Sequence, residues 1–376
     1  MADGKAALVL TGGGARAAYQ VGVLAAIREI RGRRRGNPFP ILCGTSAGGI
    51  NAAALAVYSA DFNAGVRKLA WIWRHFHVDQ VYRSDAPTLL TTGLRWSGAL
   101  LLGWVVRQTP RSLLDNSPLR DLLVRVLDFS RIRQSIDAGH LHAVSVSASG
   151  YSSGENLAFY EGVPEVQPWR RAQRVGTPTT LGVEHLMASS AIPFLFPAVM
   201  INREYFGDGS MRQLAPISPA IHMGATRILV IGSGRLADEG RQHADGYPSL
   251  AQIAGHALSS IFLDGLTVDL ERMQRINSTL NAFDEAERDA AGIVLRPIET
   301  LVISPSQRLD AIAGRHRDAL PRPLKTLLRG VGAMRREGSA LLSYLLFEPG
   351  YTHALMQLGY EDAFARRREV EAFLRI

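Results

Sequence analysis

The chain has 376 residues and a formal net charge of +8, with 47% hydrophobic and 20% charged residues. This is the composition of a globular protein with a sizeable core, organised as one large domain or two ordinary ones, and it excludes extensive disorder. The basic balance favours an anionic partner, although an arginine-rich proteome would produce the same balance. The single cysteine, Cys43, excludes an intramolecular disulfide.

The amino-terminal stretch MADGKAALVLTGGGAR lacks the basic and apolar regions of a secretory signal. The longest apolar run, SGALLLGWVV at 97–106, is about half the ~18 residues needed to span a bilayer. We therefore expect a cytoplasmic protein without a transmembrane anchor.

The first elements in chain order follow an α/β pattern. Apolar residues predict a buried strand at 5–11, which a glycine-rich turn joins to a helix. A second buried strand is predicted at 39–43, with a helix beginning near Ser46. The order strand, turn, helix occurs twice in succession, and this repetition predicts that the two strands are parallel. The segment 61–135 is mostly helical in pattern, and Pro118 marks the first turn of one helix.

The remainder of the chain adds strands and then helices. Strands are predicted at 140–149, 157–162, 225–234 and 300–306. Proline, glycine and charged residues predict surface loops around 164–180 and 234–247. The final 70 residues predict arginine-rich helices. The expected fold is a three-layer α/β/α sandwich with a mainly parallel central sheet and a helical C-terminal extension.

Three glycines at 12–14 stand between the first strand and its helix. Backbone amides at such a place can hold a phosphate or stabilise an oxyanion. Gly12, Gly14 and Ala17 fit the dinucleotide fingerprint, but the next strand ends without the acidic residue that would bind a ribose. A tight turn with no ligand is the third interpretation.

The stretch Gly44-Thr45-Ser46-Ala47-Gly48 fits the pattern G-x-S-x-G. A nucleophile elbow needs small residues around its serine, because the backbone turns sharply between a strand and a helix. An apolar strand precedes this stretch and an alanine-rich helix follows it. The pattern therefore predicts Ser46 as a nucleophile.

Asp208 lies between two glycines in FGDGS. An acid on such a turn can reach into a site, but Asp-Gly is also a hairpin dipeptide, and local sequence alone favours the hairpin. A serine nucleophile needs a base, and none of the ten histidines lies in a distinctive motif. His222 keeps a Ser–Asp–His order open. The His-x-His pairs have no third ligand nearby, so we expect no metal site.

Together these motifs resemble the patatin-like phospholipase family. TGGGARAAYQVGVL resembles its glycine-rich loop, GTSAGGINAA its nucleophile elbow and FGDGS its Asp-Gly-Gly motif. MASSAIPFLFPAV, at 187–199, resembles a stretch that the family places before that aspartate. The order and rough spacing agree over about residues 5–224. The later chain resembles the C-terminal extension of some bacterial members.

The resemblance implies a serine–aspartate dyad without histidine. Ser46 would be the nucleophile and Asp208 its base. The amides of Gly12, Gly13 and Gly14 would form the oxyanion hole. Supporting residues would be Arg16, Gly44, Gly48, Gly207 and Gly209. Ala17 and Ser210 stand where the family usually has glycine, which puts substrate preference in question more than activity.

The resemblance also implies the function and the domain organisation. We expect a patatin-like catalytic domain at 5–224, a continuation of the α/β core at 225–305 and a helical extension at 306–376. The expected activity is hydrolysis of lipid acyl esters, of the phospholipase A or lysophospholipase type, without metal or cofactor.

Three alternatives stay open: a catalytically weak lipid-binding scaffold, an esterase or thioesterase using His222, and a nucleotide-binding protein. The expected partners are a lipid or acyl-ester substrate and, transiently, an anionic membrane at its inner face. Nucleic acid is not expected, because the basic residues are dispersed. Residues 85–112 predict either an interfacial helix or a buried one. The sequence does not determine the oligomeric state.

Overall fold

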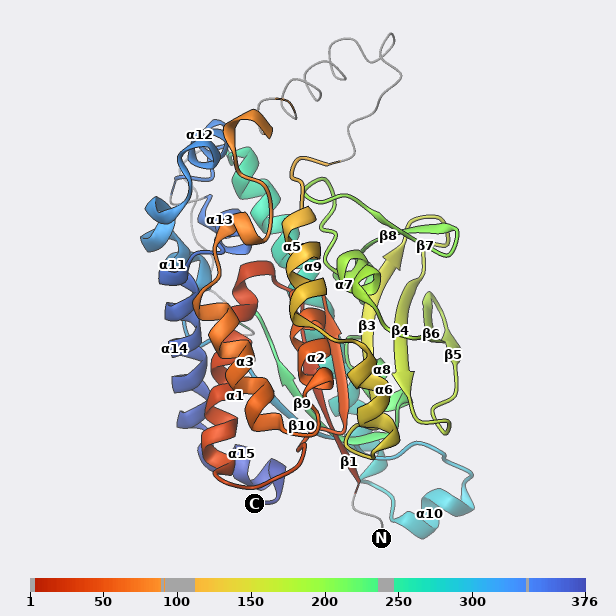
Figure 1. The fold of residues 1–376 in the computed structure, drawn as a ribbon. Coiled ribbons are helices and arrows are strands. Elements are labelled where there is room, and N and C mark those ends of the chain that lie inside the picture. Colours follow the sequence, from red (N-terminus) through yellow and green to blue (C-terminus); the bar gives the residue numbers. More distant parts are fainter. Residues whose placement is uncertain (1–3, 89–90, 92–111, 236–246, 336–337) are drawn as a thin grey trace.

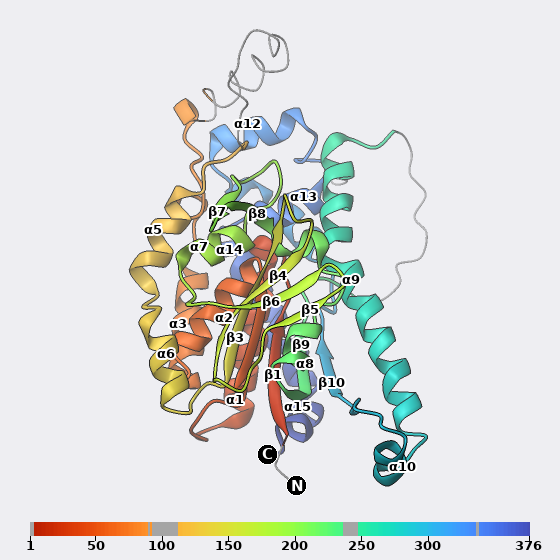
Figure 2. The same cartoon turned by 90° about the vertical axis from the view of Figure 1, so that its right-hand side faces the viewer.

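A single mixed sheet runs through the molecule, with helices on both faces (Figures 1 and 2). This computed structural model describes residues 4–88, 91, 112–235, 247–335 and 338–376. The strands are β1 (Lys5–Leu10), β2 (Ile41–Thr45), β3 (Ala143–Gly150), β4 (Asn156–Gly162), β5 (Trp169–Arg171), β6 (Arg174–Pro178), β7 (Val199–Ile201), β8 (Glu204–Asp208), β9 (Ala225–Ile231) and β10 (Glu299–Ile303).

The helices before β9 are α1 (Ala18–Arg31), α2 (Ala47–Val57), α3 (Phe62–Arg74), α5 (Ser117–Val126), α6 (Ser130–Asp137), α7 (Val183–Ser189) and α8 (Ser218–His222). Those after it are α9 (Leu250–Leu280), α10 (Glu285–Ala290), α11 (Leu309–His316), α12 (Arg322–Gly330), α13 (Ser339–Leu345), α14 (Pro349–Ala365) and α15 (Arg367–Leu374). Short 3-10 turns are η1 (Gly14–Ala17), η2 (Val78–Gln80), η3 (Gly209–Arg212) and η4 (Arg317–Ala319).

The centre of the sheet is parallel. The strand order is β10-β9-β1-β2-β3-β4-β6-β5, and every neighbouring pair from β10 to β3 is parallel. β1 occupies the middle of this parallel part, and its apolar side chains are buried on both faces, as expected for a strand covered by two helical layers. The remaining strands join by antiparallel and parallel pairs at the β3 side.

Two apolar layers cover the sheet. Leu8, Leu42 and Val146 point into the larger layer, with α1, α2, α3 and α14. Val9 and Cys43 point into the other, which includes Leu266 of α9 and Ala220 of α8. The predicted three-layer α/β/α sandwich with a mainly parallel sheet is confirmed, and helices α11 to α15 confirm the predicted helical C-terminal region.

The surface loop predicted around 164–180 is wrong in part, because β5 and β6 lie there. β6 pairs with β4, and β5 turns back along β6. The Trp169 ring stacks on Tyr160 with centroids 5.1 Å apart and is buried there, while the two arginines of β5 are exposed.

Two other predictions fall mainly outside the described residues. They are the interfacial or buried helix at 85–112 and the surface loop at 234–247. Strands before and after residue 224, the predicted end of the catalytic domain, belong to one sheet. The domain boundaries at 224 and 305 stay predictions. Among the described helices, none combines the length and the apolar character needed to cross a bilayer.

Candidate active site

Strands β2 and β8 end head to head along one edge of β3. β2 pairs with β3 up to Thr45 opposite Ser147, and β8 arrives from the other direction, with Asp208 opposite Ala148. β4 already occupies the other edge of β3 at Ala148, so β8 must continue the line of β2. The register therefore brings Ser46, which follows Thr45, to Asp208, although 162 positions (208 minus 46) separate them in the sequence.

Ser46 forms the turn between β2 and α2. Its backbone angles, φ of 56° and ψ of −132°, are unfavourable for any residue other than glycine. Such backbone strain is typical of a nucleophile elbow. The turn is possible because its neighbours are small. A Cβ on Gly48 would lie 2.5 Å from the Thr11 carbonyl oxygen, and one on Gly44 would overlap the Gly48 carbonyl. The first turn of α2 therefore packs directly on the glycine loop.

The last residue of α7 holds the elbow in place. The Ser189 hydroxyl accepts a hydrogen bond from the Ser46 amide at 2.8 Å and donates one to the Ser147 carbonyl at 2.6 Å. Ser189 is fully buried. Its hydroxyl therefore connects α7, β3 and the strained residue, and both of its hydrogen-bonding roles are used.

The Asp208 carboxyl is fully buried beside this turn. Its Oδ1 accepts the Ser210 amide at 2.9 Å, while its Oδ2 has no hydrogen bond of ordinary geometry among the described residues. Burial raises the pKa of Asp208 to about 6, against the lowering effect of the Ser46 hydroxyl and of Ser210. The Ser46 hydroxyl is among the groups that lower the pKa of Asp208, so the serine side chain lies beside this carboxyl. A carboxyl with this pKa can accept a proton near neutral pH.

The glycine loop follows β1, directly beside the elbow. Within the described part of the chain, the buried amides of Gly12 and Gly13 donate to no carbonyl or side chain. Buried amides without acceptors are rare in folded proteins, and these two can receive an oxyanion. Gly14 has a φ of 53°, and a Cβ there would overlap the Tyr344 carbonyl. Glycine is therefore required at this position by conformation and by space.

Two helices beyond residue 224 fix the glycine loop. The buried Arg16 donates from Nε to the Ser343 hydroxyl at 2.8 Å, and its guanidinium lies 3.9 Å from the ring centre of Tyr344. Tyr344 stacks on Phe262 of α9 at 5.1 Å. Phe262 in turn lies against Gly12. Arg16, predicted as a supporting residue, thus connects the loop to α13.

The glycines around Asp208 are sites of close approach. The Tyr151 hydroxyl lies 2.5 Å from where a Gly207 Cβ would be, and a Cβ on Gly209 would overlap the Ser147 carbonyl. Ser210, which replaces the usual glycine, does not have a positive φ, so the serine causes no backbone strain. Ala17, the other departure from the family pattern, is fully buried.

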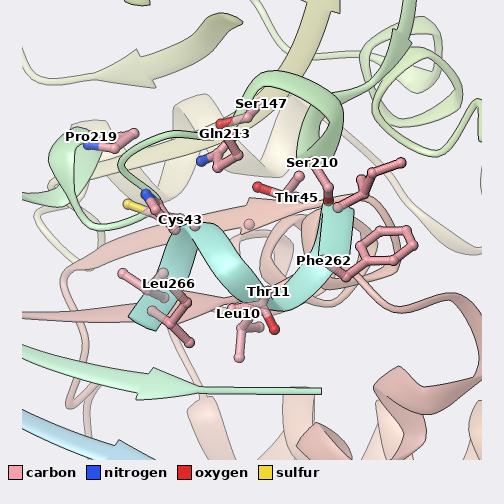
Figure 3. A pocket seen from close by; sticks show the side chains of 16 residues that line it. Leu10, Thr11, Cys43, Thr45, Ser147, Ser210, Gln213, Pro219, Phe262 and Leu266 are labelled. Carbon is pink, nitrogen blue, oxygen red and sulfur yellow. The ribbon is translucent and has the colours of Figure 1, made fainter. Parts of the chain in front are cut away.

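A cavity of about 20 Å³ lies against the ends of these strands (Figure 3). Thr11, Thr45, Ser147, Ser210 and Phe262 line it. This volume holds about one water molecule and no acyl chain. Ser46 itself is 2% exposed, so the site is closed to a lipid in this conformation.

The histidine alternative has little geometric support. The His222 ring stacks on Trp169 at 4.9 Å, and burial with the nearby Arg171 and Arg174 lowers its pKa to about 4. Trp169 belongs to the apolar layer that also contains Val9 and Cys43. No histidine in the described ranges hydrogen-bonds to Ser46 or Asp208.

Sequence reasoning did not identify Ser189, Ser343, Tyr344 or Phe262 as parts of this site. Ser189 lies in the quoted stretch MASSAIPFLFPAV, and Ser343 and Tyr344 open the stretch SYLLFEPGYTHALMQLGYEDA, which resembles the C-terminal extension of some bacterial members. Phe262 comes from a helix that no motif distinguishes.

Known proteins share sequence features with this chain. The model of the family described as patatin-like phospholipase matches residues 8–221. A cGAMP-activated phospholipase of Pseudomonas aeruginosa (strain BWHPSA011 / Pa011) is 28% identical over 211 residues, which are 56% of this chain and 53% of that protein. The match thus spans about half the length of that relative. The crystal structure of VipD from Legionella pneumophila aligns with 97% of this chain and 67% of its own, at 14% identity and a TM-score of 0.36. Since the family model covers more than half of the chain and includes the glycine loop, the elbow and Asp208, the chain belongs to the patatin-like phospholipase family.

Proposed function

We propose that the protein hydrolyses acyl esters of lipids through a Ser46–Asp208 dyad. The observation that carries this proposal is the meeting of β2 and β8, which puts a strained serine beside a buried carboxyl with a pKa of about 6. A base is most effective when its pKa lies near the working pH, and this one does.

The reaction then follows in two stages. Asp208 takes the Ser46 Oγ proton while Oγ attacks the ester carbonyl, and the start of α2 favours the developing negative charge. The amides of Gly12, Gly13 and Gly14 receive the oxyanion. The proton passes from Asp208 to the leaving alcohol. Water, activated by Asp208, then hydrolyses the acyl-enzyme and regenerates the serine.

The proposed substrate is a membrane lipid of the phospholipase A or lysophospholipase type. Because Ser46 is closed off in this conformation, lipid entry requires movement of the elements around the site. We propose that this occurs during transient contact with an anionic membrane, at its inner face. The basic net charge supports this partner.

The test is the intact mass of the protein after treatment with a fluorophosphonate, alongside Ser46→Ala, Asp208→Asn and His222→Ala. A single adduct that is absent in Ser46→Ala and strongly reduced in Asp208→Asn supports the dyad. Labelling that survives in Asp208→Asn but disappears in His222→Ala supports the esterase with a triad. No adduct in the wild type, with anionic vesicles present, supports the lipid-binding scaffold.

A further inference from the structure

Helix α12 and the start of α9 form an exposed surface that is both basic and apolar. We call it the α9–α12 surface and define it by Arg322, Lys325, Arg329, Leu327, Tyr247, Leu250 and Ile253. It lies outside the segment that the family model matches. Figures 1 and 2 place α12 at the end of the molecule toward which β3 runs, far from the start of β1. Because β2, β3 and β1 all end on that side, the surface and the elbow share one end of the sheet.

The charge of this region is strongly one-sided. Residues 311–335 contain Arg315, Arg317, Arg322, Lys325, Arg329 and Arg335 against the single acid Asp318. Within the described part of the chain, no carboxylate forms an ion pair with Arg322, Lys325 or Arg329. The Lys325 ammonium donates to the Asp318 carbonyl, at 3.0 Å.

Helix α12 separates its faces by helical spacing. Leu324 and Leu328 are buried, while Arg322 and Arg329 are exposed on the opposite side. Leu327 is also exposed, between the two kinds of face. Helix α12 therefore turns its basic face to solvent, with one exposed apolar side chain at the border of that face.

The start of α9 adds the apolar part. Tyr247 is 94% exposed and Leu250 is 69% exposed, and Ile253 follows one helical turn later. The Ala251 amide donates to the Val331 carbonyl at 3.0 Å, which holds this end of α9 against the end of α12. The exposed apolar side chains therefore adjoin the cations.

We infer that the α9–α12 surface binds the anionic headgroups of a membrane and inserts its apolar side chains between them. Cations that have no ion-pair partner among the described residues match lipid phosphates in charge, and large exposed apolar side chains beside them fit the acyl boundary. The inference depends on the proposed function for its biological purpose, since docking here would bring the closed site to its substrate. The binding itself does not require catalysis.

The test measures binding to vesicles in the Ser46→Ala background, which cannot consume the lipid. Sedimentation with phosphatidylcholine vesicles is compared with sedimentation with vesicles that contain one quarter phosphatidylglycerol. We expect binding to the anionic vesicles only. The triple variant Arg322→Gln, Lys325→Gln and Arg329→Gln should weaken it by on the order of 100-fold, because each cation near the surface contributes on the order of fivefold.

A matched control carries the same charge change elsewhere. Arg33→Gln, Arg34→Gln and Arg35→Gln alter the loop that follows α1, at the opposite end of the sheet. These changes should leave binding within about threefold. Leu250→Ser with Leu327→Ser should weaken binding on the order of tenfold, through the lost apolar contact. Equal losses in the two triple variants, or no loss in either, would overturn the inference.

Other occupants of this surface are separate outcomes of the same experiment. A dimer that the α12 triple variant dissociates, or a preference for single-stranded DNA over vesicles, would assign the surface to another partner and overturn the inference. Fluorophosphonate labelling in the Ser46-containing protein separates the two proposals. If labelling fails while vesicle binding still depends on α12, the proposed function fails and the docking surface stands.

Discussion

Replacing Ser189 by alanine tests whether its hydroxyl holds the nucleophile. The change removes the acceptor of the Ser46 amide and the donor to the Ser147 carbonyl, and both groups are buried. A buried polar group left without a partner costs about 1–3 kcal/mol. We therefore expect the free energy of unfolding to fall by about 2–4 kcal/mol, a large share of the roughly 5–15 kcal/mol typical of proteins.

The neighbouring Ser190 supplies the control. Its Oγ is also buried, but it has no hydrogen-bond partner among the described residues. Ser190→Ala should change stability by less than about 1 kcal/mol, because only an unsatisfied hydroxyl is lost. The two serines have the same volume and neighbouring positions, so the difference between the two variants isolates the two hydrogen bonds.

The assays are urea unfolding and the second-order rate of fluorophosphonate labelling of the folded protein. A loosened elbow misplaces Oγ, and a displacement of about 1 Å can cost about 100-fold in rate. We expect Ser189→Ala to label about 10- to 100-fold more slowly and Ser190→Ala to label at the wild-type rate. Equal stability and equal labelling of the two variants would refute the reasoning.

Four further results are expected. The rate of ester hydrolysis should rise with pH about a midpoint near 6, as Asp208 ionises, and a rate that still rises above pH 8 would exclude this carboxyl as the base. Ser210→Ala should move that midpoint upward, since Ser210 lowers the pKa of Asp208; an unchanged pH–rate curve would contradict this role. Because the pKa of Asp208 is raised in the folded protein, the free energy of unfolding falls as pH rises from about 4 to 6. Asp208→Asn should therefore abolish turnover yet raise the free energy of unfolding at pH 8 by on the order of 3 kcal/mol. In urea titrations this gain in stability should vanish below about pH 4. Burial raises the pKa of Cys43 to about 12, so the folded protein should resist thiol reagents that label it in urea.

The local parts of the site could be predicted from the sequence. The elbow requires small residues at adjacent positions, and Gly44 and Gly48 show this directly. The strands at 5–11, 39–43, 225–234 and 300–306 correspond to β1, β2, β9 and β10, because buried parallel strands are continuous apolar runs.

Asp208 shows why the rest could not be predicted locally. The local pattern favoured a hairpin turn, but the hairpin turns at Asn202 and Arg203, both with positive φ. Asp208 instead ends the second strand of that hairpin, and only the pairing of β8 with β3 brings it to Ser46. The edge pair β5–β6 was missed because β5 is short and mostly arginine, while β6 contains glycine and proline.

The contacts that complete the site join distant parts of the chain. The bond from Ser46 to Ser189 spans 143 residues, and the bond from Arg16 to Ser343 spans 327 residues. Periodicity reports on a residue's neighbours in its own element, and it carries no information on such pairs.

The central place of β1 has a consequence for how the chain folds during synthesis. β1 can pair with β2 early, but the hydroxyl of Thr11 reaches the Ile231 carbonyl across 220 residues. At roughly 5–20 residues per second, that edge of β1 stays unpaired for roughly 10–45 s on the ribosome. During this interval an apolar strand edge is open to wrong partners, which makes the nascent chain dependent on protection from aggregation. The glycine loop also contacts Tyr344, so the candidate site is complete only when almost the whole chain has emerged.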